Sequence, residues 1–149
     1  MNRITILFIS VIILLLSCGN SDRNQIEDLL SIRQKAFETK NVNLYLSCVS
    51  PEYSDNDNGK RIGVEDIKKR FLSNVSIFDS VKIRNRDISV YIDNDKAIVV
   101  QKAEVKLKIE NDESLYKLNE RISFGKVDGR WKIVKESDAD FLEGFVFGG

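Results

Sequence analysis

Three polar side chains occupy positions that the hydrophobic pattern of the chain assigns to the protein interior. Arg33 lies in a helical stripe of apolar residues, whereas Gln101 and Glu120 lie on the apolar faces of two alternating segments. An ionic group is costly to bury unless it is paired with an opposite charge. We therefore expect Arg33 and Glu120 to face each other, with Gln101 nearby.

Two interpretations of these residues remain open. In the first, Arg33 and Glu120 form a structural ion pair with Gln101 hydrogen-bonded beside them, or the side chains reach solvent at a strand end. In the second, the three residues form the floor of a pocket for a small polar or amphipathic ligand. The walls of that pocket are then three aromatic residues: Tyr53, Tyr116 and Trp131.

The sequence contains little that resembles catalytic machinery. Histidine, the commonest general base near neutral pH and the commonest metal ligand, is absent. We therefore assign no catalytic residue and expect neither a metal nor a cofactor. The alternative is a small isomerase- or hydrolase-like pocket enzyme that uses Asp55, Asp57 or Glu120 as its general acid or base.

Length and charge indicate one domain with an ordinary surface. The chain has 149 residues, which is enough for one domain with a substantial core. Its 23 basic and 23 acidic residues balance and are interspersed along the sequence. This balance argues against a nucleic-acid partner, because such proteins concentrate positive charge to meet the phosphate backbone.

An apolar segment near the N-terminus ends in the sequence Leu15-Leu16-Ser17-Cys18. It follows Arg3 and is shorter than the ~20 residues that a membrane-spanning helix needs. These features resemble the signal peptide and lipobox of bacterial lipoproteins. The resemblance implies that residues 1–17 are removed, that Cys18 carries lipid, and that residues 18–24 form a tether to the membrane.

The same resemblance implies where the protein is located and in what chemical state its two cysteines are. The protein is then lipid-anchored in the cell envelope and faces the periplasm or the exterior. Gly19, in place of an aspartate after Cys18, favours the outer membrane if the cell is Gram-negative. Because Cys18 is committed to lipid, Cys48 has no disulfide partner, and we expect it to pack as a small apolar residue.

The rest of the chain predicts three helices followed by an antiparallel sheet, an α+β plan. The first helix is expected from an N-cap at Asp22 to about residue 40, the second over residues 42–49, and the third over residues 64–74, burying Leu72 among others. Alternation begins near residue 81, with Ile88 expected inside. Turns are expected at residues 94–95, 111–113 and 128–129.

Three motifs in this order resemble the NTF2-like (SnoaL-like) superfamily. They are residues 36–53, which contain AFETKNVNL and SCVSPEY, residues 63–71, which begin GVEDI, and residues 128–133, DGRWKI. The resemblance covers the whole domain, taken as residues 25–136. It implies a strongly curved sheet wrapped around the first helix, forming a cone with a central pocket.

The resemblance does not extend to the ketosteroid-isomerase branch of that superfamily. That branch uses a tyrosine on the first helix, and matching the motif places Arg33 near that position. The missing tyrosine argues against the branch's enolisation chemistry.

Residues 137–149 form an unusually apolar C-terminal tail. We expect it to pack back on the domain, across the cone or along a sheet edge; the alternative is a partner-binding or dimerisation strand. The leading hypothesis is therefore a lipid-anchored, extracytoplasmic, non-catalytic module that binds a small ligand in the cone or a protein partner, with a homodimer through the sheet or the tail as one form of partner.

Overall fold

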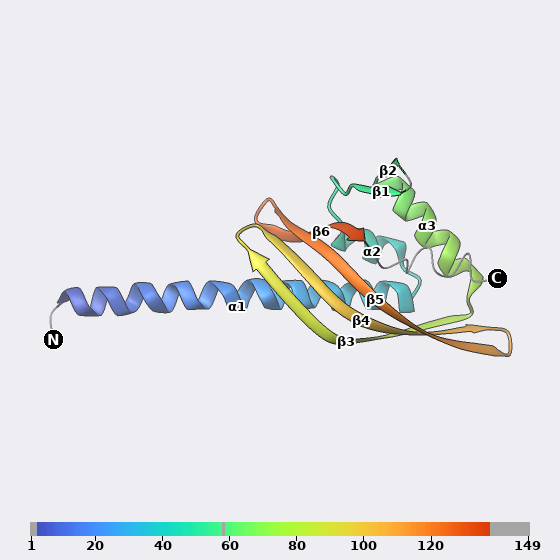
Figure 1. Ribbon diagram of the computed structural model, residues 1–149, viewed down its shortest axis with the longest axis horizontal. Coiled ribbons are helices and arrows are strands. Elements are labelled where there is room, and N and C mark those ends of the chain that lie inside the picture. Colours follow the sequence, from blue (N-terminus) through green and yellow to red (C-terminus); the bar gives the residue numbers. More distant parts are fainter. Residues whose placement is uncertain (1–2, 58, 138–149) are drawn as a thin grey trace.

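The computed structural model describes residues 3–57 and 59–137, with side chains for residues 21–56 and 59–136. Within this part of the chain the helices are α1 (Arg3–Glu38), α2 (Val42–Cys48) and α3 (Val64–Ile77). A short hairpin, β1 (Asp55–Asp57) and β2 (Lys60–Ile62), lies between α2 and α3, followed by the strands β3 (Ser80–Asp93), β4 (Lys96–Ile109), β5 (Asp112–Val127) and β6 (Arg130–Ser137). The predicted α+β plan is confirmed (Figure 1).

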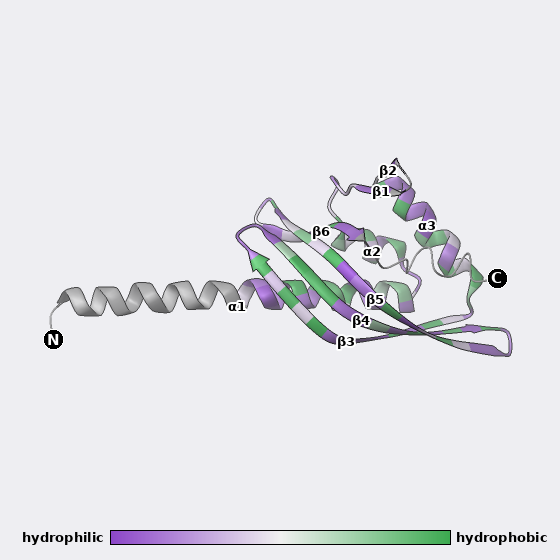
Figure 2. Cartoon of the chain, in the orientation of Figure 1, coloured by the Kyte–Doolittle hydropathy of each residue, from purple (hydrophilic) through white to green (hydrophobic). Residues whose placement is uncertain are grey.

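The four long strands form one antiparallel sheet in the order β3-β4-β5-β6. Helix α1 lies across one face of this sheet, with α2 beside it (Figure 1). Hydrophobic and hydrophilic residues alternate over much of β3, β4 and β5 (Figure 2). Alternate side chains point to opposite faces, so the sheet has a buried, mostly apolar inner face toward α1 and an exposed, mostly polar outer face.

The long helix α1 does not begin where the sequence predicted. Asp22 lies within the helix, so the predicted N-cap at this residue is wrong. Its carboxylate instead accepts hydrogen bonds from Trp131 and Lys126 of the sheet, 104 and more residues away in the chain. Among the described residues, no helix combines the length and apolar character that crossing a membrane requires.

The two shorter helices differ from prediction in detail. Asn41 caps α2, since its side chain accepts a hydrogen bond from the Leu44 N–H. Helix α3 runs to Ile77, three residues beyond the predicted end, and Leu72 is 43% exposed rather than buried. The same helix buries Phe71, which the sequence predicted.

The predicted sheet pattern is confirmed over most of its length. The odd positions of β4 from Ala97 to Leu107 are buried, and the two-residue turn at Asp128 and Gly129 has both residues at positive φ, as a type I′ hairpin requires. Ile88 is an exception at 41% exposed, because a β-bulge between Arg86 and Ser89 shifts the register there.

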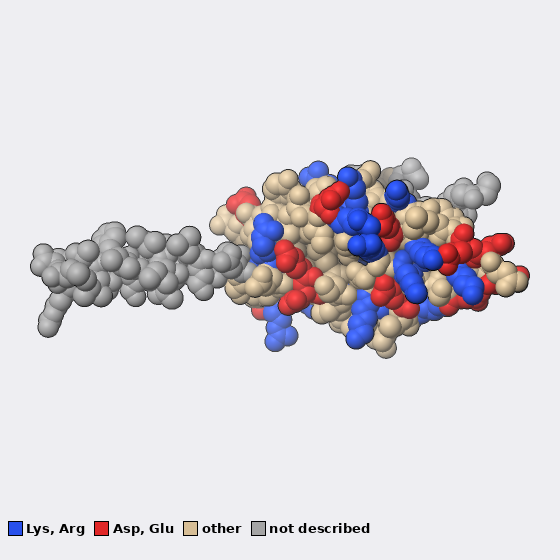
Figure 3. Space-filling model, turned by 90° about the horizontal axis from the view of Figure 1, so that it is seen from below, with Lys and Arg blue, Asp and Glu red and all other residues tan. Residues whose placement is uncertain are grey.

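Aromatic residues fill the space between the helices and the sheet. Phe37 of α1, Tyr45 of α2 and Phe71 of α3 contact one another, with ring centroids 4.8–5.3 Å apart. On the outside, acidic and basic side chains are interspersed over the face shown in Figure 3, as the composition predicted for a solvated surface.

Candidate functional site

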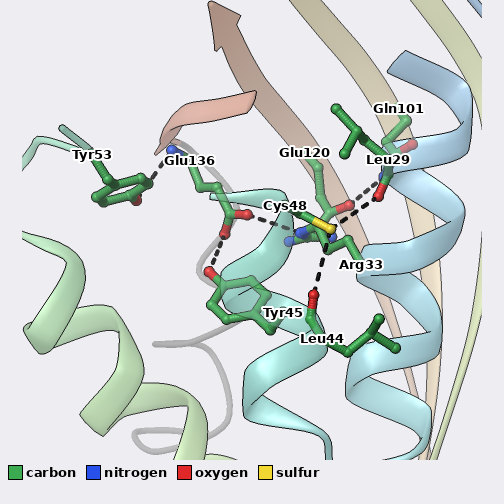
Figure 4. Close-up of polar contacts among 9 residues, drawn as sticks. All are labelled: Leu29, Arg33, Leu44, Tyr45, Cys48, Tyr53, Gln101, Glu120 and Glu136. Carbon is green, nitrogen blue, oxygen red and sulfur yellow. Dashed lines mark hydrogen bonds and ion pairs between the residues drawn. The ribbon is translucent and has the colours of Figure 1, made fainter. Parts of the chain in front are cut away.

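Arg33 lies at the centre of a buried polar network between α1 and the sheet. Its Nη2 donates to Glu120 Oε1 at 3.1 Å, and its Nε donates to Glu136 Oε1 at 2.9 Å (Figure 4). The guanidinium carbon also lies 5.3 Å from the centre of the Phe37 ring. The expected pairing of Arg33 with Glu120 is therefore present, and a second acid joins it.

Gln101 contacts the second carboxylate oxygen of Glu120. Its Nε2 donates to Glu120 Oε2 at 2.6 Å, while its Oε1 has no hydrogen-bond partner among the described residues. Gln101 pairs directly with Glu120 across β4 and β5, so the sheet register itself places the two side chains together.

Glu136 and Tyr45 are members of the network that the sequence pattern did not predict. The Tyr45 hydroxyl donates to Glu136 Oε2 at 3.2 Å, and the Glu136 N–H donates to the Tyr53 hydroxyl at 3.2 Å (Figure 4). Each of the four oxygens of Glu120 and Glu136 therefore accepts a hydrogen bond.

A bulge in β6 explains why Glu136 was missed. Trp131 and Ile133 point inward, which by simple alternation would turn Glu136 outward. The register between β5 and β6 shifts between Ser123 and Phe124, so that Glu136 pairs with the buried Ile122. Nothing in the eight-residue pattern of β6 marks this shift in advance.

The network is closed off from solvent. The side chains of Arg33 and Glu120 are 2% and 0% exposed, and that of Glu136 is 5% exposed. Burial by itself disfavours the charged guanidinium, but the two carboxylates outweigh it and raise the pKa of Arg33 above its usual value. Arg33 therefore stays charged, and two acids share one cation.

The two tyrosines of the network keep their protons more strongly than usual. Burial, with Glu136 adding to it, raises the pKa of Tyr45 well above its ordinary value. Burial also raises the pKa of Tyr53, again with a contribution from the Glu136 carboxylate. Both hydroxyls act as neutral hydrogen-bonding groups at physiological pH.

The six residues expected to form a pocket do not all meet. Arg33, Gln101, Glu120 and Tyr53 belong to the network, but Tyr116 is 39% exposed toward the other end of β5. Trp131 is buried at the end of the sheet where Asp22 lies, and its Nε1 donates to Asp22 Oδ1 at 3.0 Å. Lys126 completes this contact, with its Nζ 3.1 Å from Asp22 Oδ2 and 5.1 Å from the Trp131 ring centre.

Among the described residues, Asp55 forms its ion pair outside the network. Asp55, in β1, forms an ion pair with Lys135, whose Nζ lies 3.1 Å from Asp55 Oδ1. The side chain of Asp57 lies outside the described residues. So do the side chain of Cys18 and the apolar tail beyond residue 137. Cys48 is buried, and burial raises the pKa of its thiol.

No described group of side chains fits a metal ion. Nowhere in the described part of the chain do three Cys, Asp or Glu residues lie close enough to hold one. A hollow of about 430 Å³ lies on the outer face of the sheet, lined by Arg86, Lys102 and Lys117 among others. It is crossed by exposed ion pairs and shares no residue with the network.

Comparison with solved structures identifies the fold. A candidate dehydratase of the NTF2-like family from Streptomyces avermitilis superposes with a TM-score of 0.69 at 12% identity, covering 78% of this chain and 94% of that one. A candidate ketosteroid isomerase from Shewanella frigidimarina gives 0.62 at 16% identity, covering 73% and 90%. A type 2 hexachlorocyclohexane dehydrochlorinase gives 0.68 at 14%, covering 79% and 84%.

The chain thus has the NTF2-like fold that the three motifs predicted. No family model matches the sequence, and no curated protein matches it. At these identities the likeness extends to the fold alone, which hosts unrelated activities. The role of the interior therefore depends on the chemistry of the network itself.

Proposed function

We propose that this protein is a lipid-anchored, extracytoplasmic module of the NTF2-like fold that binds a ligand or a protein partner without catalysing a reaction. One observation carries the non-catalytic part. The two acids that converge in the interior, Glu120 and Glu136, are both bound to Arg33 and buried.

A general acid or base must exchange a proton with a substrate that it touches. Glu120 has one oxygen on Arg33 and the other on Gln101, and Glu136 has one oxygen on Arg33 and the other on Tyr45. Releasing either acid would leave part of an ionic network unpaired in the interior, which is costly. The arrangement supports a structural role for these residues.

The anchor is supported by the lipobox-like sequence, and the contacts of the residues just after it fix how far the domain would lie from a lipid on Cys18. Asp22 is fixed to Trp131 and Lys126, and Arg23 donates to the Val90 carbonyl at 3.1 Å. Asp22 is four residues from Cys18, a reach of at most ~14 Å. A lipid on Cys18 would therefore hold this end of the domain close to the membrane surface.

Two measurements test the anchor. Mass spectrometry of the N-terminal peptide should show acyl chains on Cys18, and the lipidated protein should fractionate with membranes. A Cys18→Ala variant should lose both the lipid and the membrane fraction, whereas Cys48→Ala serves as the matched control and should keep them. A Cys18→Ala protein that still fractionates with membranes contradicts the anchor.

The non-catalytic role has its own test. Glu120→Gln retains the shape of the side chain but removes its charge, so a structural acid predicts a less stable protein that keeps its binding partner. Native mass spectrometry of protein released gently from membranes can follow the copurified ligand or partner. Unchanged stability together with loss of a bound small molecule would assign Glu120 to a ligand site instead.

A small pocket enzyme is the second candidate, because two acids do converge in the interior and similar folds include a named dehydrochlorinase. In such an enzyme a substrate would displace Gln101 or Arg33 from Glu120. A crystal structure with a small molecule in direct contact with Glu120 would favour the enzyme.

A further inference from the structure

The middle of the outer sheet face carries more basic than acidic side chains, although the whole chain is balanced at 23 of each. Two hollows on this face are lined by six basic residues and two acidic ones. The basic residues are Lys82, Arg84, Arg86, Lys102, Lys106 and Lys117, and the acidic ones are Asp87 and Glu104. The excess of positive charge therefore comes from the placement of the residues and not from the composition.

The two hollows are neighbours, because Glu104 lines both of them. The larger, of about 430 Å³, also contacts Lys102 and Lys117, and the smaller, of about 200 Å³, contacts Lys82 and Leu115. Together they extend from β3 across β4 to β5. We refer to this surface, formed by the eight charged residues and Leu115, as the basic groove.

Two pairs of like charges face each other directly across β3 and β4 in the basic groove. Lys82 is the register partner of Lys106, and Arg86 is that of Lys102. Like charges directly opposite each other destabilise a sheet. Neutral residues that favour strands, such as threonine, would fit these exposed positions without that cost. The arrangement therefore opposes stability and suggests a use in binding.

The acids of the groove neutralise only part of its positive charge. Glu104 lies between Arg84 and Lys117 in the sheet register, but its carboxylate pairs with Arg86 instead, at 3.1 Å. Arg84 and Lys117 therefore form no ion pair among the described residues, and neither does Lys82. These three bases can meet the charges of an anionic partner.

The spacing of the bases suits an extended peptide. Lys82, Arg84 and Arg86 follow one another on the same face of β3 at intervals of ~7 Å. Alternate side chains of an extended peptide have the same spacing, so acids at alternate positions can each reach a base. Leu115, which is 61% exposed, adds an apolar wall that suits a peptide side chain better than a phosphate polymer.

The charge of the groove also argues against a second copy of this chain as its occupant. A symmetric dimer joins the same patch of both subunits. Through this face it would place cations against cations, which opposes association. An acidic partner is the better fit.

We propose that the basic groove binds an acidic segment of a partner protein in an extended conformation. The segment lies along β4, with acids at alternate positions that meet Lys82 and Arg84 on one side and Lys117 on the other. An apolar side chain of the segment packs against Leu115. The inference rests on the partner-binding part of the proposed function and names the surface that performs it.

Fluorescence anisotropy with synthetic peptides tests the groove in the full chain, purified in a neutral detergent. The probe is a labelled peptide with glutamate at alternate positions and one leucine, and the reference peptide has the same composition with its glutamates consecutive. The parent protein should bind the alternating peptide more tightly than the reference. Arg84→Glu combined with Lys117→Glu should weaken this binding by about tenfold or more, because it sets acids against acids.

A matched control has the same change in net charge elsewhere on the surface. Lys96 and Arg130 are exposed and line neither hollow. Lys96→Glu combined with Arg130→Glu should therefore change the affinity by less than about twofold at physiological salt, where distant surface charges are screened.

Two single substitutions sharpen the assignment. Glu104→Gln removes the acid that both hollows share and releases Arg86, so it should tighten the binding of the alternating peptide. Leu115→Ser should weaken it, because the leucine of the peptide loses its apolar contact. Unchanged affinity in both variants would contradict the proposed arrangement.

The proposal is overturned if the parent does not bind the alternating peptide, or if the charge-reversed variant binds it equally well. If that variant does not fold, Arg84→Ser combined with Lys117→Ser provides the same comparison, with a smaller expected loss. Inorganic polyphosphate that displaces the peptide and binds the parent and Leu115→Ser equally would assign the groove to a phosphate polymer instead.

These outcomes are separate from those that test the proposed function. Acyl chains on Cys18 are detected by mass spectrometry, and the role of Glu120 is measured through the stability of Glu120→Gln. Both results can stand when the groove fails to bind an acidic peptide, and an acidic peptide can bind to a chain that carries no lipid.

Discussion

Two ion pairs of the same length lie at different depths in this protein. The distance from Arg33 Nη2 to Glu120 Oε1 and the distance from Arg86 Nε to Glu104 Oε2 are both 3.1 Å. The first pair is 2% and 0% exposed, whereas the second, on the outer face of the sheet, is 46% and 26% exposed. The two distances are equal, so they cannot account for a difference in the contributions to stability, which must come from the surroundings, including the second acid on Arg33.

The surroundings act through solvation. Water around Arg86 and Glu104 screens their attraction and can replace either partner if the other is removed. Arg33 and Glu120 are at most 2% exposed, so solvent cannot take the place of a lost partner there, and an orphaned charge would remain buried. The attraction within the buried pair therefore matters less for stability than the unpaired buried charge that would remain if one partner were removed.

Replacing the two arginines with methionine tests this difference most strongly. Arg33→Met should lower the free energy of unfolding by about 3–5 kcal/mol, because it leaves Glu120 and Glu136 buried without a cation. Arg86→Met should lower it by less than about 1 kcal/mol. Urea denaturation of both variants beside the parent protein measures the two losses, and similar losses would contradict the comparison.

A double-mutant cycle sharpens the same point. Adding Glu120→Gln to Arg33→Met should recover part of the loss, with a coupling of about 0.5–3 kcal/mol, since the acid that remains unpaired becomes neutral. The cycle of Arg86→Met with Glu104→Gln should show coupling close to the experimental error. A null coupling in the first cycle would place Glu136, rather than Glu120, as the main partner of Arg33.

Alkaline pH provides a test of the tyrosines that border the buried pair. The folded state raises the pKa of Tyr45 and Tyr53, so the unfolded chain loses these protons first, near pH ~10. Stability should therefore be unaffected below that pH and should fall as the pH rises above it. Measured by denaturation from pH 8 to 11, the fall should be smaller in Tyr45→Phe, and an equal fall would show that other groups cause it.

The sequence allowed the centre of the network to be predicted but not its border. A polar residue is easy to recognise when it interrupts a long run of regularly spaced apolar residues, as is the case for Arg33, Gln101 and Glu120. Tyr45 lies in a helix of seven residues, which is too short to define an apolar face. Glu136 lies beyond a register shift that reverses which residues point inward.

The residues whose environment was predicted wrongly have a similar explanation. Asp22 looks like an N-cap because its sequence neighbours suit one, whereas its actual partners, Trp131 and Lys126, are more than 100 residues away. Tyr116 continues the inner face of β5 but is 39% exposed, and periodicity does not show where the burial of a face ends.

A smaller effect on stability, seen at acid pH, is expected for Asp22. Its contact with Trp131 and Lys126 is intermediate between buried and exposed. The hydrogen bond from Trp131, aided by Lys126, lowers the pKa of the Asp22 carboxyl. Its contribution to stability is thus present above its unfolded pKa near ~3.9 and is lost as pH falls through the lowered value. Asp22→Asn should be less stable than the parent at pH 7, and the gap in thermal unfolding should close toward pH 2–3. A gap that persists at pH 2 would show that shape, rather than charge, holds the contact.

The smallest effect is expected for the pair that is most exposed among the described residues. Lys102 Nζ lies 2.8 Å from Asp87 Oδ2, closer than the atoms of the buried pair, but the two side chains are 64% and 66% exposed. If depth rather than distance decides, Lys102→Ala should leave the melting temperature unchanged within error, and added salt should not separate the variant from the parent. Lys102 is the neighbour of Gln101 on the opposite face of β4, so Gln101→Ala, which removes the hydrogen bond to Glu120, is the matched control and should destabilise the protein measurably. A larger loss in Lys102→Ala than in Gln101→Ala would mean that contact distance, and not burial, sets the energetics of this sheet.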